Sequence, residues 1–181
     1  MSEPRPRVLL IGYGNPGRLD DGLGPALAEA MERRRLPGVT VDADYQLTVE
    51  DAAAVASHDV VVFADAAEDG PEPLGFRRIA PEMAVSFSTH SVSPQAVLGM
   101  AHGMFAARTA GYLLGIRGYA FNEFGERLSE KARANLAAAV AFTERLLHTG
   151  GFDEAADTTN NQTTAGTPPA HEDEPCRTES T

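Results

Sequence analysis

Cysteine is almost missing from the 181-residue sequence, in which Cys176 is the single one. One thiol cannot form a disulfide within the chain, and no Cys-x-x-Cys pair is present to hold a metal ion. Such a chain fits a reducing compartment. Long apolar runs are missing too. No stretch approaches the roughly 20 apolar residues that cross a bilayer, and the N-terminal letters MSEPRPRVLLIG contain no signal-peptide core. We therefore expect a soluble, cytoplasmic protein that does not act at a membrane.

Basic residues are scarce relative to acidic ones. Lys and Arg number 15 against 26 Asp and Glu, so the formal net charge is −11. Proteins bind nucleic acid mainly by neutralising phosphates with Lys and Arg, so this balance argues against nucleic acid as a partner. The apolar content, 43%, is ordinary for a globular protein, and the length suits one core. We predict a domain over residues 1–149 and a disordered acidic and polar tail over residues 150–181, where core-forming residues become rare.

Continuous apolar runs predict the strands of a parallel sheet. Val8–Gly12 and Asp59–Ala64 are of the kind found in strands buried on both faces. Leu23–Arg35 has apolar residues at helical spacing. Further strands are predicted over Val39–Val41, Gly75–Ile79, Val85–Phe87 and Tyr112–Ile116, and further helices over Thr48–Ser57, Ser93–Ala107 and Leu128–His148. Strands that alternate with helices predict an α/β fold, a three-layer sandwich in which helices flank a mostly parallel, twisted sheet.

The letters GYGNPG at residues 12–17 follow the first predicted strand and match the glycine pattern of dinucleotide-binding proteins. That pattern expects the third glycine to open a helix whose N-terminus faces a pyrophosphate. Here the helix is predicted to begin only after Gly22, and Asp20 and Asp21 stand where the phosphates would lie. The loop is also similar to the opening of peptidyl-tRNA hydrolases. Those enzymes carry a histidine soon after the loop, whereas the first histidine here is His58. Both interpretations remain alternatives.

A third interpretation takes the loop together with the residues that follow it. GYGNPGRLDDGLG resembles the opening motif of the [NiFe]-hydrogenase maturation protease family. Two later segments agree with that family: Asp65, which follows the letters VVVFA, and STHSVSPQAVL, which contains His90. Three segments are similar to the members that serve soluble, NAD-reducing hydrogenases: DADYQLTVEDA, FSTHSVSPQAV and IRGYAFNEFGERLS. One departure is Asp21, because many members carry the longer Glu there.

The resemblance implies a phosphorylase/hydrolase-like fold and an aspartate-dependent endopeptidase. Its substrate would be the hydrogenase large-subunit precursor, from which it removes a C-terminal extension after nickel insertion. The metal-binding set implied is Asp21, Asp65 and His90, with Asp21 and Asp65 also catalytic. The nickel is expected to be carried by the substrate, and no organic cofactor is expected. The general placement supports this set, because loops at the carboxyl ends of parallel strands converge, and two carboxylates with one imidazole suit Ni(II) or Zn(II).

Several points stay open at this stage. Asp20 either orients the metal-binding set or is a plain loop residue. The substrate's nickel could polarise the scissile carbonyl, or an aspartate could act as the general base while nickel serves recognition. A non-catalytic chaperone that recognises a nickel site is the alternative to an enzyme, since a fold does not dictate an activity.

Overall fold

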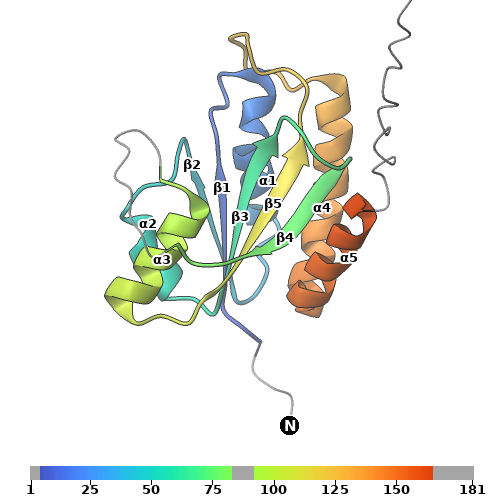
Figure 1. The fold of residues 1–181 in the computed structure, drawn as a ribbon. Coiled ribbons are helices and arrows are strands. Elements are labelled where there is room, and N and C mark those ends of the chain that lie inside the picture. The colour runs from blue at the N-terminus through green and yellow to red at the C-terminus, as the bar shows by residue number, and fades with distance from the viewer. Residues whose placement is uncertain (1–4, 83–91, 165–181) are drawn as a thin grey trace, which may run out of the picture.

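The computed structural model describes residues 5–82 and 92–164, with side chains as far as residue 159. Its centre is a five-stranded sheet in the order β2-β1-β3-β5-β4 (Figure 1). The strands are β1 Val8–Tyr13, β2 Val39–Asp44, β3 Val60–Ala67, β4 Leu74–Ile79 and β5 Ala110–Arg117. All neighbours pair in parallel except β4, which lies antiparallel to β5 at one edge. The prediction of a mostly parallel sheet is therefore confirmed.

Helices cover both faces of this sheet. They are the 3-10 helix η1 Leu19–Gly22 and the α-helices α1 Leu23–Glu32, α2 Asp51–Ala56, α3 Pro94–Phe105, α4 Glu130–Thr149 and α5 Phe152–Thr164. Successive side chains of a strand point to opposite faces. Val8 and Leu10 of β1 accordingly pack in a buried cluster with α1, α4 and α5, and Leu9 and Ile11 pack in a second cluster with α2 and α3. The predicted three-layer sandwich is confirmed (Figure 1).

Helix α5 corrects the predicted start of the disordered tail. Residues 152–164 form a helix, so the prediction of disorder from residue 150 onward is wrong for them. Phe152 and Ala156 are buried against the rest of the fold, and the Tyr112 ring lies 5.4 Å from the Phe152 ring. Two apolar residues four positions apart suffice to dock a polar helix, and a composition average does not register them. Residues 165–181, with Cys176, lie outside the described residues, and their disorder stays a prediction.

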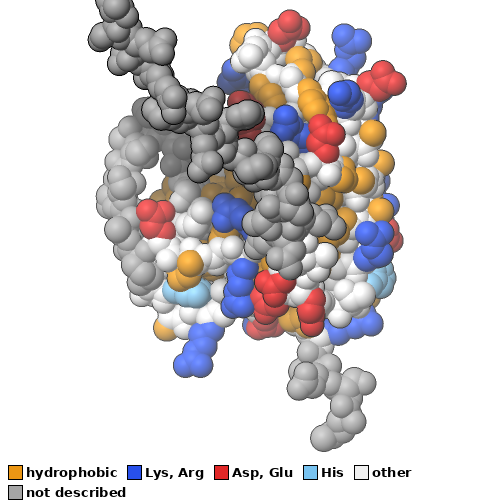
Figure 2. All heavy atoms as spheres, turned by 45° about the vertical axis from the view of Figure 1, so that its right-hand side comes forward, with side chains coloured by type: hydrophobic (Ala, Val, Ile, Leu, Met, Phe, Trp, Pro, Cys, Tyr) orange, Lys and Arg blue, Asp and Glu red, His pale blue; other side chains and the backbone are white. Residues whose placement is uncertain are grey.

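Smaller differences concern element ends. Helix α2 begins at Asp51 instead of near Thr48. The Asp51 carboxylate nevertheless accepts hydrogen bonds from the Thr48 backbone N–H at 2.7 Å and from its hydroxyl at 3.2 Å, the contact of a capping box. The strand predicted over Val85–Phe87 lies outside the described residues. None of the helices in the described part of the chain is both long and apolar enough to span a bilayer. On the face shown in Figure 2, acidic and basic side chains are interspersed.

Candidate functional site

The glycine loop brings the start of α1 against the sheet. A Cβ atom on Gly12 would collide with the Gly24 carbonyl oxygen, and one on Gly24 would collide with the carbonyl oxygens of Tyr13 and Ala64. Only glycine permits this approach of helix backbone to β1 and β3. Close packing therefore accounts for the first and last glycines of the motif GYGNPGRLDDGLG. Helix α1 begins at Leu23, after Asp20 and Asp21, which disfavours a pyrophosphate at its N-terminus.

Asp21 lies on η1, beyond the carboxyl end of β1. Its Oδ2 atom accepts a hydrogen bond of 2.9 Å from the Asn15 backbone N–H. The Asn15 side chain in turn accepts one of 2.8 Å from the Gly17 backbone N–H. Asp21 is half-buried. The glycine loop thus holds this carboxylate in one place while leaving part of it accessible.

Asp65 lies near the carboxyl end of β3 and is also half-buried. Its Oδ1 atom accepts a hydrogen bond of 2.7 Å from the Ala66 backbone N–H, and the Tyr13 hydroxyl donates a further one to the carboxylate. Burial raises the pKa of Asp65 to about 6, and the charge of Asp21 adds to the rise, against the two hydrogen bonds. The 3-10 helix η1, which carries Asp21, also contacts β3, which carries Asp65. The two aspartates therefore lie on adjoining elements at the same end of the sheet.

Asp20 has a different role from its neighbour, because its carboxylate is wholly buried. It accepts hydrogen bonds from the backbone N–H groups of Tyr119, Ala120 and Ser129, at 2.8, 3.0 and 2.7 Å, and from the Ser129 hydroxyl at 2.8 Å. Burial alone would raise the pKa of Asp20, but these hydrogen bonds outweigh it and lower the pKa below its usual value. Asp20 ties η1 to the connection between β5 and α4, and so fixes the position of Asp21.

His90, the third member of the sequence-predicted set, lies outside the described residues. Among the residues that are described, no group of three His, Cys, Asp or Glu side chains could hold a metal ion. Two other histidines serve packing and main-chain contacts. The His58 ring bonds to the Ala54 carbonyl and the Thr40 hydroxyl, and the His102 ring bonds to the Thr109 carbonyl. The structure thus places Asp21 and Asp65 on adjoining elements at one end of the sheet, and their role as a set with His90 stays a prediction.

Tyr13 is a candidate residue that the sequence reasoning missed. It occupies the variable position of the Gly-x-Gly letters, and the motif assigns no role to that position. The alternation of side chains along a strand could have placed Tyr13 on the same face of the sheet as Asp65. Leu9, Ile11 and Tyr13 share the face that α2 and α3 cover, and on the neighbouring strand Phe63 and Asp65 share it as well. Burial first, then the Asp65 charge and hydrogen bond, raise the pKa of Tyr13 above its usual value, so it remains a hydrogen-bond donor to Asp65 at neutral pH.

A cleft of about 270 Å³ opens beside this edge of the sheet. It follows the carboxyl ends of β3 and β5, next to the pair of aspartates along the strands. The residues that line it are Glu68, Arg117, Gly118, Tyr119, Phe121 and Asn122. Sequence reasoning also missed this cleft, because its residues come from two connections about fifty positions apart.

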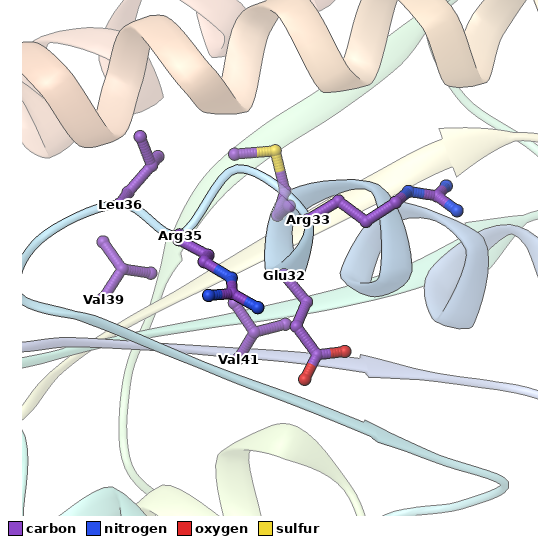
Figure 3. A pocket seen from close by; sticks show the side chains of 7 residues that line it. Glu32, Arg33, Arg35, Leu36, Val39 and Val41 are labelled. Atoms are coloured by element: carbon purple, nitrogen blue, oxygen red, sulfur yellow. The ribbon is translucent and has the colours of Figure 1, made fainter.

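A second hollow, of about 500 Å³, lies at the other end of the sheet (Figure 3). Leu36, Val39 and Val41 line it beside Glu32 and two arginines, where α1 ends and β2 begins. Val39 pairs with Val8 at the amino ends of the strands. This hollow is therefore remote from Asp21 and Asp65 and does not belong to the candidate site.

Fold and site together define a class: a three-layer α/β protein with two half-buried carboxylates near the carboxyl ends of parallel strands. Neither a protein-family model nor a functionally described protein matches the sequence. Solved structures do match the fold. The [NiFe] hydrogenase maturation protease HycI of Thermococcus kodakarensis KOD1 is 23% identical, with a TM-score of 0.62, over 79% of this chain and 93% of its own.

Two further structures agree. The hydrogenase-maturating endopeptidase HybD of E. coli is 24% identical, with a TM-score of 0.57, over 81% of this chain and 95% of its own. The hydrogenase 2 maturation peptidase of Thaumarchaeota archaeon SCGC_AB-539-E09 is 24% identical, with a TM-score of 0.59, over 78% of this chain and 98% of its own. The chain therefore has the fold of hydrogenase maturation proteases across nearly their whole length.

Proposed function

We propose that the chain is an endopeptidase that removes the C-terminal extension from the precursor of a [NiFe]-hydrogenase large subunit after nickel insertion. The observation that carries this proposal is the placement of Asp21 and Asp65 on adjoining elements at one end of the sheet, in a chain with the maturation-protease fold. A fold alone does not specify a reaction. The paired carboxylates supply chemistry at the edge of the sheet where the resemblance in sequence expects the site.

In this proposal the nickel belongs to the substrate. Asp21 and Asp65 offer carboxylate oxygens, and His90 would add an imidazole nitrogen, a mixed set that suits Ni(II). Nickel held by the precursor would dock on these side chains and place the scissile bond at a fixed position beside them. A precursor without nickel lacks that anchor, so cleavage would wait for metal insertion.

Two routes for the hydrolysis follow from the same arrangement. In the first, Asp65 takes a proton from a water molecule while the water oxygen attacks the scissile carbonyl carbon. The proton then passes from Asp65 to the leaving amine nitrogen. Tyr13 orients Asp65 for this transfer through its hydroxyl. In the second, the substrate's nickel polarises the scissile carbonyl, and Asp65 acts only as a ligand.

We propose that the partner is the large-subunit precursor of a soluble, NAD-reducing hydrogenase and that the protein binds it in the cytoplasm. Two of the segments with that resemblance, residues 42–52 and 116–129, run from β2 into α2 and from β5 to the start of α4. Both lie at the carboxyl ends of the strands and so flank the candidate site. Each exposes an aromatic side chain, Tyr45 at 67% and Phe124 at 92%, and exposed aromatics are frequent in protein interfaces.

The test is to incubate nickel-loaded precursor with the protein and follow the precursor mass by mass spectrometry. We expect a mass loss equal to the C-terminal extension, no loss with nickel-free precursor, and no loss with Asp65→Asn. Asp157→Asn, an exposed position on α5, is the matched control and should cleave normally. Full activity of Asp65→Asn would exclude both hydrolytic routes. Stable complex formation without any mass loss would identify a nickel-site chaperone in place of an enzyme.

A further inference from the structure

The pairing register of β3 and β5 fixes where the cleft lies relative to Asp65. On β5, Gly115 lies opposite Asp65 and Arg117 lies opposite Ala67. Asp65, Ala67, Gly115 and Arg117 occupy the same face of the sheet, because they are two residues apart on paired strands. Arg117 therefore follows Asp65 by two positions, about 6.6 Å along the strands. An extended peptide that reached Asp65 would place a residue one or two positions away at Arg117.

Arg117 is held in place without a counter-charge. Its Nη1 donates a hydrogen bond of 2.9 Å to the Gly70 carbonyl, and its guanidinium carbon lies 5.6 Å from the centre of the Tyr119 ring. Its own carbonyl accepts a bond of 2.9 Å from Asn135. Among the residues that the structure describes, no carboxylate lies within ion-pair distance of it. This half-buried positive charge is oriented but unpaired, in a chain whose net charge is −11.

Nη1 of this guanidinium is engaged by Gly70, which leaves the edge formed by Nε and Nη2. Nε of Arg117 is buried, and no described residue offers it an acceptor. Arginine binds carboxylates and carbonyl oxygens along an edge through two N–H groups. An oxygen brought into the cleft would bind the edge that Nε and Nη2 form, and a carboxylate oxygen would also compensate the charge.

The other lining residues suit a peptide. Glu68 can accept a main-chain N–H, and the Asn122 amide can both donate and accept. Phe121 and Tyr119 supply apolar surface. The Tyr119 hydroxyl is already engaged, donating to Glu72 at 2.6 Å. We infer that this cleft is a peptide subsite, in which Arg117 binds a carbonyl or carboxylate oxygen of the precursor close to the scissile bond. The identity of the peptide rests on the proposed function.

The first experiment measures processing kinetics of nickel-loaded precursor by Arg117→Ala, with Arg117→Lys and Arg108→Ala beside it. Arg108 is an exposed arginine in the α3–β5 connection and serves as the matched control. We expect KM to rise at least about tenfold in Arg117→Ala with kcat within about twofold, which corresponds to about 1.4 kcal/mol of substrate binding. Arg117→Lys keeps the charge without the planar edge and should recover part of the loss. A KM equal to that of Arg108→Ala overturns the subsite.

The second experiment does not depend on cleavage and separates the two oxygen sources. The Arg117 Nε–H resonance of the full chain is followed by NMR during titration with acetyl-Gly-Glu-Gly-amide and with acetyl-Gly-Gln-Gly-amide. A shift with the Glu peptide alone assigns a carboxylate, and equal shifts assign a carbonyl oxygen. No shift with either at millimolar concentration overturns the inference. If the wild-type chain fails to process precursor but the resonance shifts, the proposed substrate is wrong and the subsite stands.

Discussion

Asp20 and Ser129 lie 109 residues apart in sequence and are joined by two hydrogen bonds. The Ser129 backbone N–H donates at 2.7 Å and its hydroxyl at 2.8 Å, one to each carboxylate oxygen. Ser129 also caps α4, since its hydroxyl oxygen accepts from the Ala132 backbone N–H. One buried carboxylate therefore joins η1, which carries Asp21, to the first turn of the longest helix.

Replacing Asp20 with Ala should destabilise the chain strongly. The backbone N–H groups of Tyr119, Ala120 and Ser129 would lose their acceptor, and buried donors without partners are costly. We expect the free energy of unfolding to fall by about 3 kcal/mol, measured by urea denaturation. Asp157→Ala, at an exposed position, should change it by less than about 0.5 kcal/mol. A loss for Asp20→Ala as small as the control's would show that water replaces the carboxylate.

Replacing Tyr13 with Phe should slow processing without unfolding the chain. The change removes only the hydroxyl that donates to Asp65, so the carboxylate loses a group that orients it. Losing such an orienting partner commonly costs about 10- to 100-fold in activity. The cleavage rate of nickel-loaded precursor is the measurement. Tyr112→Phe, which removes a hydroxyl that bonds to Asp153 on α5, is the control and should match the wild type. Equal rates for both variants would remove Tyr13 from the site.

Tyr112 should make the docking of α5 sensitive to alkali. Burial, followed by the hydrogen bond to Asp153 at 2.8 Å and the Asp153 charge, raises the pKa of Tyr112 to about 12. The folded-state pKa is above the usual value of about 10, so this stabilisation is complete below about pH 10 and is lost as the pH rises through about 12. Ultraviolet difference titration of wild type against Tyr112→Phe isolates this group among the 4 tyrosines.

The same titration on Asp153→Asn provides the contrast. Without the Asp153 charge, the pKa of Tyr112 should move down toward its usual value. An unchanged or higher pKa would mean that burial alone sets it. Arg78 also binds Asp153, at 2.8 Å. Arg78→Ala removes this ion pair and should leave the Tyr112–Asp153 hydrogen bond formed, so its titration provides a second comparison for the pKa of Tyr112.

Ending the chain after Gly150 should lower its stability, whereas ending it after Thr164 should not. The shorter chain loses Phe152, which is buried against the Tyr112 ring. Tyr112 itself stacks on Phe76 with ring centres 5.3 Å apart, so a ring cluster would face solvent. We expect a loss of about 3 kcal/mol, as for removal of a buried aromatic side chain. Thermal unfolding of both truncated chains is the measurement, and equal midpoints would contradict a structural role for α5.

Much of the central sheet was predictable because its signals are local. The runs VLLIG and VVVFA are apolar throughout, and such runs form strands buried on both faces. The placement of Asp21 and Asp65 at one end of the sheet followed from topology, since both come beyond or near the carboxyl ends of neighbouring parallel strands. The predicted position of His90 beside these aspartates stays a prediction, because His90 lies outside the described residues.

What the sequence did not reveal depends on distant partners. Asp20 resembles any loop aspartate until Tyr119 and Ser129 are seen beside it, about a hundred positions further along. Helix α5 has a polar composition, and only its contact with β4 and β5 shows why it is ordered. The Arg117 cleft likewise forms only where two connections meet. Such features arise from packing between segments, for which no single window of sequence carries a signal.

Strand β2 ends the sheet on one side, and among the described residues it pairs only with β1. Open edges of this kind can recruit a strand from another molecule. Here the edge ends in Asp42 and Asp44, both exposed. A second copy of β2 added in parallel and in register would place Asp42 beside Asp42 and Asp44 beside Asp44, and like charges across strands are unfavourable. The acidic residues at the end of β2 thus also disfavour the addition of strands from other molecules to this edge of the sheet.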